Sequence, residues 1–125
     1  MNKIEKDINV TRYDIPVRIH YVQSTNLIPL IFHVKDYEIP SGSTARVYVK
    51  RPDGTAEYDN AVLNGNTVTV AVKKTMFSVA GDSRLQIRIA KGEDVLVSFE
   101  ILVDVRKNHA DGGMKSENIT DIFDE

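Results

Sequence analysis

Hydrophobic and polar residues alternate with a period of two along most of this chain. Such alternation is typical of β-strands that bury one face and expose the other. The apolar positions are rich in valine and isoleucine, which favour the pleated surface of a sheet. Alternating runs begin near Ile15, Ala45, Thr67, Arg84 and Val95. The pattern predicts an all-β protein of roughly seven to nine strands.

One segment departs from the alternation because it is apolar on both faces. Leu27 to Val34 reads LIPLIFHV, so we expect a strand that is central or covered on both sides. Pro29 has no amide hydrogen to donate to a ladder, and it therefore predicts a strand start, an edge or a bulge.

Turn sequences separate the predicted strands. Asn64-Gly65 lies between two apolar runs and predicts a tight hairpin, and Pro52-Asp53-Gly54 predicts a second reversal. Because turns recur every ~8–12 residues, we predict an antiparallel β-sandwich with an Ig-like layout. Residues 73–79 (KKTMFSV) break the alternation and predict one helical turn over an end of the core.

The last part of the chain has a different character. We assign residues 1–107 to the sandwich domain and residues 108–125 to a linker followed by a short amphipathic C-terminal helix. Ile119, Ile122 and Phe123 have the spacing of one helical face. A helix this short is marginal alone, so it docks on its own domain, self-associates with other copies, or begins a longer helix.

Composition excludes several classes of protein. The chain has no cysteine, which removes disulfides, thiolate metal sites and a cysteine nucleophile. A net charge of -2 with interspersed acids and bases does not suggest nucleic-acid binding. No apolar run approaches the ~18 residues of a membrane span, and the first residues lack the apolar core of a secretory signal.

Motifs for chemistry are absent from the sequence. His20, His33 and His109 do not have the spacing of metal ligands, and no nucleophile elbow, phosphate loop or dinucleotide fingerprint occurs. We therefore predict no enzyme activity and assign no catalytic, cofactor-binding or metal residues. The acids near Pro52-Asp53-Gly54 fit a solvated turn better than a carboxylate pair across a pocket.

Three residues of the strand region are candidates for contact with a partner. Tyr48 lies on the outward phase between Arg46 and Lys50. Asp53 lies within the second reversal, and Tyr58 follows it. Tyrosine suits an interface because it combines an apolar ring with a polar tip. Tyr21 instead continues a buried phase and is expected in the core.

The order of these parts resembles a known family. The turn KRPDGT at residues 50–55, the sequence Val79-Ala80-Gly81, the turn KGED at residues 91–94 and the strand end at Val103–Val105 carry the resemblance. They are similar to the N-terminal domain of the phage baseplate upper protein family, found in siphophages and prophages of Gram-positive bacteria.

The resemblance implies a structural module of the virion, made in the bacterial cytoplasm and placed in the tail baseplate. It implies attachment to the baseplate core, with following helical segments that trimerise and carry host-recognition parts. Other baseplate proteins and a homo-oligomer, with a trimer as one option, are the expected partners. No cofactor, nucleic acid or membrane insertion is expected.

Two other classes remain open at this point. A carbohydrate-binding or adhesin-type module on the same fold predicts exposed coplanar tyrosines. An enzyme requires buried carboxylates or histidines that converge in one pocket. Fold class alone does not decide among these functions.

Overall fold

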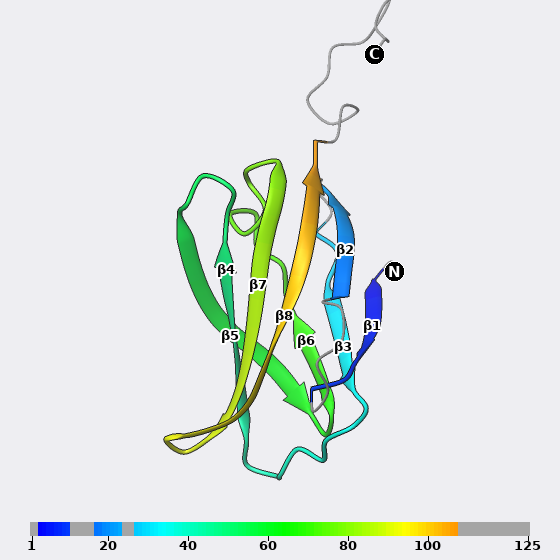
Figure 1. Cartoon of the computed structure of the whole chain (residues 1–125), viewed down its shortest axis with the longest axis vertical. Helices are drawn as coiled ribbons and strands as arrows, with labels where there is room; N and C mark the ends of the chain where they lie inside the picture. Colours follow the sequence, from blue (N-terminus) through cyan, green and yellow to red (C-terminus); the bar gives the residue numbers. More distant parts are fainter. Residues whose placement is uncertain (1–2, 11–16, 24–26, 108–125) are drawn as a thin grey trace, which may run out of the picture.

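The computed structural model describes residues 3–10, 17–23 and 27–107, which form eight β-strands and no helix (Figure 1). Their bounds are β1 (Ile4–Ile8), β2 (Val17–Val22), β3 (Leu30–Val34), β4 (Thr44–Lys50), β5 (Ala56–Asn64), β6 (Thr67–Val70), β7 (Gly81–Lys91) and β8 (Asp94–Arg106). The prediction of an all-β protein is confirmed. The amphipathic C-terminal helix was expected at residues that lie outside the described ranges.

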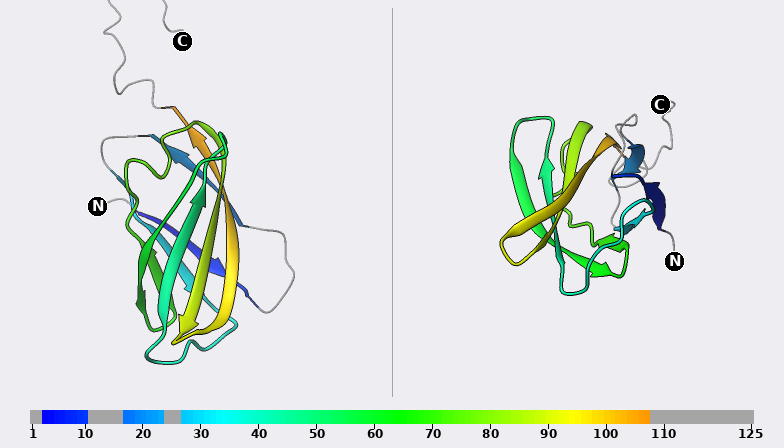
Figure 2. Two further views of the ribbon diagram at one scale, coloured as in Figure 1. Left: turned by 90° about the vertical axis from the view of Figure 1, so that its left-hand side faces the viewer. Right: turned by 60° about the horizontal axis from the view of Figure 1, so that its bottom comes forward.

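All eight strands belong to one sheet with the order β1-β3-β6-β5-β4-β7-β8-β2. Strand β5 joins the two halves, because its first six residues pair with β4 and its last three pair with β6. The sheet therefore bends at β5 and curls toward a barrel (Figure 2). Its two edge strands, β1 and β2, lie on the same side of the molecule (Figure 1).

The expected antiparallel arrangement is wrong at both edges of the sheet. β1 pairs with β3 in parallel, and β2 pairs with β8 in parallel, whereas the other five pairings are antiparallel. The separate layers of an Ig-like sandwich are not confirmed either, since β5 carries the pairing from one half to the other. Alternation of residues reveals the buried face of a strand, but it does not reveal the strand's neighbour or direction.

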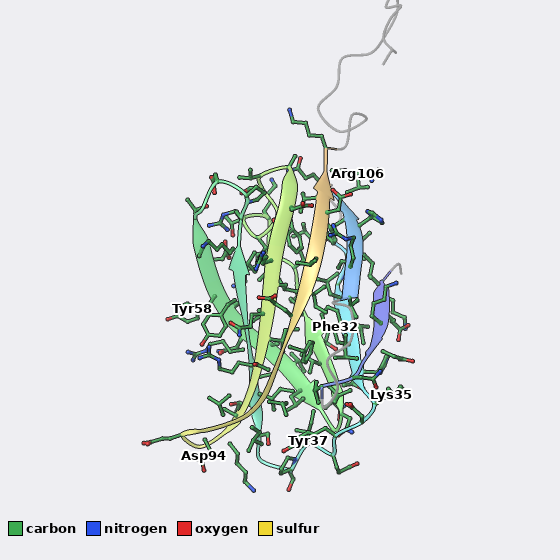
Figure 3. All side chains as sticks on the ribbon, viewed as in Figure 1. Phe32, Lys35, Tyr37, Tyr58, Asp94 and Arg106 are labelled. Atoms are coloured by element: carbon green, nitrogen blue, oxygen red, sulfur yellow. The ribbon has the colours of Figure 1, made fainter. Side chains whose placement is uncertain are left out.

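The inner surface of the curled sheet holds the core, to which every strand contributes. Phe32 lies fully buried inside it, as Figure 3 shows, and its ring meets that of Phe99 edge-on at 5.9 Å between centroids. Twelve of the larger side chains are buried to less than 2% exposure. At roughly 25 cal/mol per Å² of apolar surface removed from water, this shared interior is the main stabilising contribution to the fold.

Strand β3 has the central position that its apolar sequence predicts. It lies between β1 and β6, and its residues alternate between buried and half-buried. Pro29 directly precedes the strand, so the interpretation as a strand start is confirmed. The Pro29 carbonyl accepts a hydrogen bond from the Ile4 amide at 3.1 Å, which fixes where β1 begins to pair.

The segment between β6 and β7 forms a turn that closes one end of the core. The Met76 amide donates a hydrogen bond to the Lys73 carbonyl at 3.0 Å, and Met76 and Phe77 are buried. The Phe77 ring packs against Tyr21, with 4.8 Å between centroids. Burial raises the pKa of the Tyr21 hydroxyl, which is hydrogen-bonded to the backbone of Ile28 at 2.8 and 3.1 Å. The predicted core position of Tyr21 is confirmed.

The first residues of β8 do not follow the predicted burial. Val95 is 55% exposed, although the alternation placed it with the buried valines. The β7–β8 pairing shifts register between Ile89 and Ala90. Beyond that irregularity the hairpin extends past the rest of the sheet to its tip at Asp94 (Figures 1 and 3), so no opposite half covers it.

Candidate functional site: the basic tyrosine face

Three rows of side chains cross the outer face of the sheet on β5, β4 and β7. The backbone register places Tyr58 opposite Tyr48, and Tyr48 opposite Gln86. On one side of this aromatic row Lys50 lies opposite Arg84, and on the other side Arg46 lies opposite Arg88. We call this surface the basic tyrosine face, defined by Arg46, Tyr48, Lys50, Tyr58, Arg84 and Arg88.

The two tyrosines and two of the arginines form a continuous stack. The Tyr48 and Tyr58 ring centroids are 5.9 Å apart with 34° between their planes. The Arg46 guanidinium lies 5.0 Å from the Tyr58 centroid, and the Arg88 guanidinium lies 5.0 Å from that of Tyr48. Tyr58 remains 63% exposed and projects outward from the sheet (Figure 3). The stack therefore holds these long side chains in place while leaving aromatic surface open to a partner.

The cations of this face have no ion-pair partner among the residues that the structure describes. Lys50, Arg84, Arg46 and Arg88 make no ion pair with any residue in the described part of the chain. Like charges directly opposite each other in a sheet are destabilising, and this face has two such pairs. Arg46 and Arg88 gain cation–π contacts in this arrangement, whereas Lys50 and Arg84 have no such contact among the described residues and would gain most from an anionic partner.

A shallow groove of about 690 Å³ lies over the same surface. Both tyrosines, Lys50 and Arg84 line it, and Glu100 adds the one carboxylate of the lining that has no ion pair within the described ranges. The remaining charged lining residues are paired: Arg51 with Glu57 at 2.6 Å, and Asp82 with Arg18 at 3.7 Å. The free charge of the groove is thus positive.

The reversal at Pro52-Asp53-Gly54 lies at one end of this groove. The Asp53 side chain forms its hydrogen bonds with a residue of the same turn. The Asp53 carboxylate accepts from the Thr55 hydroxyl at 2.6 Å and from the Thr55 amide at 3.0 Å. These two bonds hold the pKa of Asp53 below its ordinary value. Gly54 has φ of 90°, the left-handed conformation that the predicted turn requires. Asp53 therefore shapes the turn, and it stays an exposed candidate for contact.

Arg51 fastens this reversal to the neighbouring loop. Its guanidinium donates to Glu57 at 2.6 Å, to the Thr75 carbonyl at 2.8 Å and to the Thr55 hydroxyl at 2.8 Å. The Thr75 hydroxyl donates in turn to Glu57 at 3.1 Å. The side chains of Arg51 and Glu57 are only 13% and 23% exposed, so this network rigidifies one end of the groove.

The two described histidines connect strands. His20 on β2 lies 3.0 Å from Asp104 on β8, and His33 on β3 lies 2.8 Å from Glu5 and 3.2 Å from Thr67 on the flanking strands. The bond from His33 is the main cause that lowers the pKa of Glu5. Neither histidine belongs to the groove, and no metal-binding cluster of three or more His, Asp or Glu residues occurs within residues 3–10, 17–23 and 27–107. The same ranges contain no helix suited to crossing a membrane.

The structure brings two of the sequence candidates into contact and leaves others undecided. Tyr48 and Tyr58 form one aromatic pair, with Asp53 near the end of their groove. Ile119, Ile122 and Phe123 lie outside the described residues. Sequence reasoning missed the opposed cations, although it placed Tyr48 on an outward phase between Arg46 and Lys50. Their meeting depends on the pairing of β4 with β7, which are not consecutive strands.

Comparison with known proteins shows which solved domain this fold is similar to. No protein-family model matches the chain, and a search of curated proteins gives no match. The all-β domain is similar in fold to a domain of a phage protein of known structure. That structure is the N-terminal domain of phage TP901-1 ORF48, with a TM-score of 0.63 and 11% sequence identity. The match covers 86% of this chain and 100% of the solved one. The expected resemblance to a phage domain is thus confirmed for the fold.

Proposed function

We propose that this chain is a non-enzymatic structural module of a phage tail baseplate. The observation that carries the proposal is the fold match over the full length of a phage protein's N-terminal domain. The resemblance of its turn and strand-end motifs to the baseplate upper protein family points to the same role. Its site of action would be the virion, after synthesis in the bacterial cytoplasm.

We further propose that residues 1–107 attach to other baseplate proteins and that residues 108–125 lead toward host-recognition parts. Two surfaces suit attachment. Among the described strands, β1 and β2 are the edges and each pairs on one side, and such edges accept a strand of a neighbour. The basic tyrosine face has the tyrosine and arginine composition of energetic hot spots at interfaces.

Purified particles test the baseplate role. Induced prophage is purified, the chain is sought by mass spectrometry, and its position is found by antibody labelling under the electron microscope. We expect the label at the distal end of the tail. Particles that lack the chain, or label confined to the capsid, would contradict the proposal.

A homo-oligomer, with a trimer as one option, is a separate part of the proposal. Ile119, Ile122 and Phe123 are the residues proposed to make the contact between chains. The mass of the full chain in solution is compared with that of a chain lacking residues 114–125. An oligomer that is unchanged by the deletion would reject this role of the tail.

Glycan binding is a second candidate, favoured by the exposed Tyr58 ring. Sugars stack on flat aromatic surfaces, but the 34° between Tyr48 and Tyr58 and the flanking arginines make this surface only partly suitable. A glycan array decides the matter, because binding that is lost in Tyr58→Ala would favour this function over protein attachment.

A further inference from the structure

The basic tyrosine face has one unpaired carboxylate beside it, Glu100 opposite Gln86 on β8, and its cations make no ion pair within the described part of the chain. It has four cations without ion pairs, arranged as two directly opposed pairs on either side of the aromatic row. The opposed pair Lys50 and Arg84 costs stability unless an anion lies between or over its members. Arg46 and Arg88 offset part of their repulsion by stacking on the tyrosines, and an anion would relieve the rest. A ligand that fits this face therefore has an acidic group on each side of an aromatic or apolar group.

The end of the same chain has this chemistry. Residues 116–125, SENITDIFDE, contain four carboxylate side chains and no cation, together with three large apolar residues. On alternate positions stand Asp121, Phe123 and Glu125, which gives the order acid, aromatic, acid. The rows of the face have the order cation, aromatic, cation.

We propose that residues 116–125 bind to the basic tyrosine face of their own domain. Asp121 would contact Lys50 and Arg84, Phe123 the tyrosine pair, and Glu125 the pair Arg46 and Arg88. The inference goes beyond the baseplate role and does not depend on it.

The spacing of Asp121, Phe123 and Glu125 matches the spacing of the three rows of the face if the segment is extended. Alternate residues of an extended chain are about 6.8 Å apart, and the three rows, two residues apart along β4 and β7, are separated by the same distance. A helix would place Glu117, Asp121 and Asp124 on one side and Ile119, Ile122 and Phe123 on the other. Only the extended form presents acids and the aromatic ring to one surface.

The connection is long enough for binding within one molecule. β8 ends at Arg106, four residues after Leu102, which lies opposite Arg84 and therefore in line with the row of Lys50 and Arg84. Strand geometry puts these points about 17 Å apart, whereas the 14 residues between Arg106 and Asp121 span up to ~46 Å. A short connection also raises the effective concentration of the segment to about the millimolar range.

Binding to the face and self-association compete for the same apolar residues. A tail seated on its own domain covers Phe123, which the proposed contact between chains also needs. Loss of the face would therefore favour the oligomer, and an acidic element of a partner protein would compete with the tail for the face.

A spin label on the full chain tests the contact. The protein has no cysteine, so Asn118→Cys gives one site for a nitroxide. We expect the label to enhance amide relaxation at Lys50, Arg84 and their neighbours, and not at β1, β3 or β6. The enhancement should not change on dilution. Enhancement that appears on unlabelled molecules mixed with labelled ones would contradict binding within one molecule.

Charge reversals in the tail provide matched controls. Asp121→Lys with Glu125→Lys should reduce the enhancement at least about fivefold, by analogy with exposed ion pairs acting together. Asp124→Lys changes the same kind of charge on the other side of the extended segment and should reduce it less than about twofold. Equal losses for Asp121→Lys and Asp124→Lys, or no loss for either, would overturn the proposal. Enhancement centred on another surface would do the same.

Discussion

The two faces of β4 carry side chains of opposite character although they share one backbone. Ala45, Val47 and Val49 point inward and are buried with at most 4% exposure. Arg46, Tyr48 and Lys50 alternate with them and form part of the basic tyrosine face. The inner set is what a stable sheet requires. The outer set opposes like charges across β4 and β7, which a stable sheet does not require.

This difference separates residues that make the fold from residues available for binding. Inner residues gain free energy by leaving water, and any gap among them costs stability. Outer cations instead retain an unfavourable repulsion that a ligand would relieve. Substitutions on the two faces should therefore change the free energy of unfolding by different amounts. At one position of the outer face, the change should have the opposite sign.

The largest effect is expected inside. Phe32→Ala should lower the free energy of unfolding by about 3–5 kcal/mol, because the fully buried ring leaves a cavity beside Phe99. Urea denaturation measures it. Tyr58→Ala is the matched control on the outer face, and it should cost less than about 1 kcal/mol. Equal costs for the two changes would remove the distinction between the faces.

An intermediate effect is expected at the reversal beside the groove. Arg51→Ala should lower the free energy of unfolding by about 1.5–3 kcal/mol, since it leaves the half-buried Glu57 without its cation and frees the Thr75 carbonyl. Arg84→Ala, which breaks no ion pair, should stay within about 0.5 kcal/mol. A negligible cost for Arg51→Ala would show that the network is not rigid.

A smaller effect is expected at low pH, where the hydrogen bonds of Asp104, one of which joins β2 to β8, should weaken. Asp104 accepts hydrogen bonds from Arg106 and His20 at 3.0 Å, and these hold its pKa below the ordinary value of 3.8. Because the folded pKa is depressed, this stabilisation is present above the ordinary pKa and is lost as the pH falls through the folded pKa. Stability measured from about pH 5 to pH 2 should fall, and Asp104→Asn should flatten the fall. An unchanged slope in the variant would contradict the assignment.

Sequence patterns predicted the inner face well because burial acts on each residue separately. Val47, Ile87 and Val103 lie where their alternation put them, and the Asn64-Gly65 hairpin forms with φ of 62° at Gly65. The parallel edges and the opposed cations were not predicted. Both depend on which strands become neighbours in the sheet. The pairs in question, β2 with β8 and β4 with β7, lie far apart in the sequence.

Lys50→Glu gives the most direct test of the claim that the outer face is arranged for binding. In a chain that lacks residues 114–125, the substitution replaces the opposed pair with Arg84 by an attractive one, so the free energy of unfolding should rise by about 0.2–1 kcal/mol. In the full-length chain, the same substitution should abolish the relaxation enhancement from the label at residue 118. A variant that is less stable and keeps the enhancement would contradict the account.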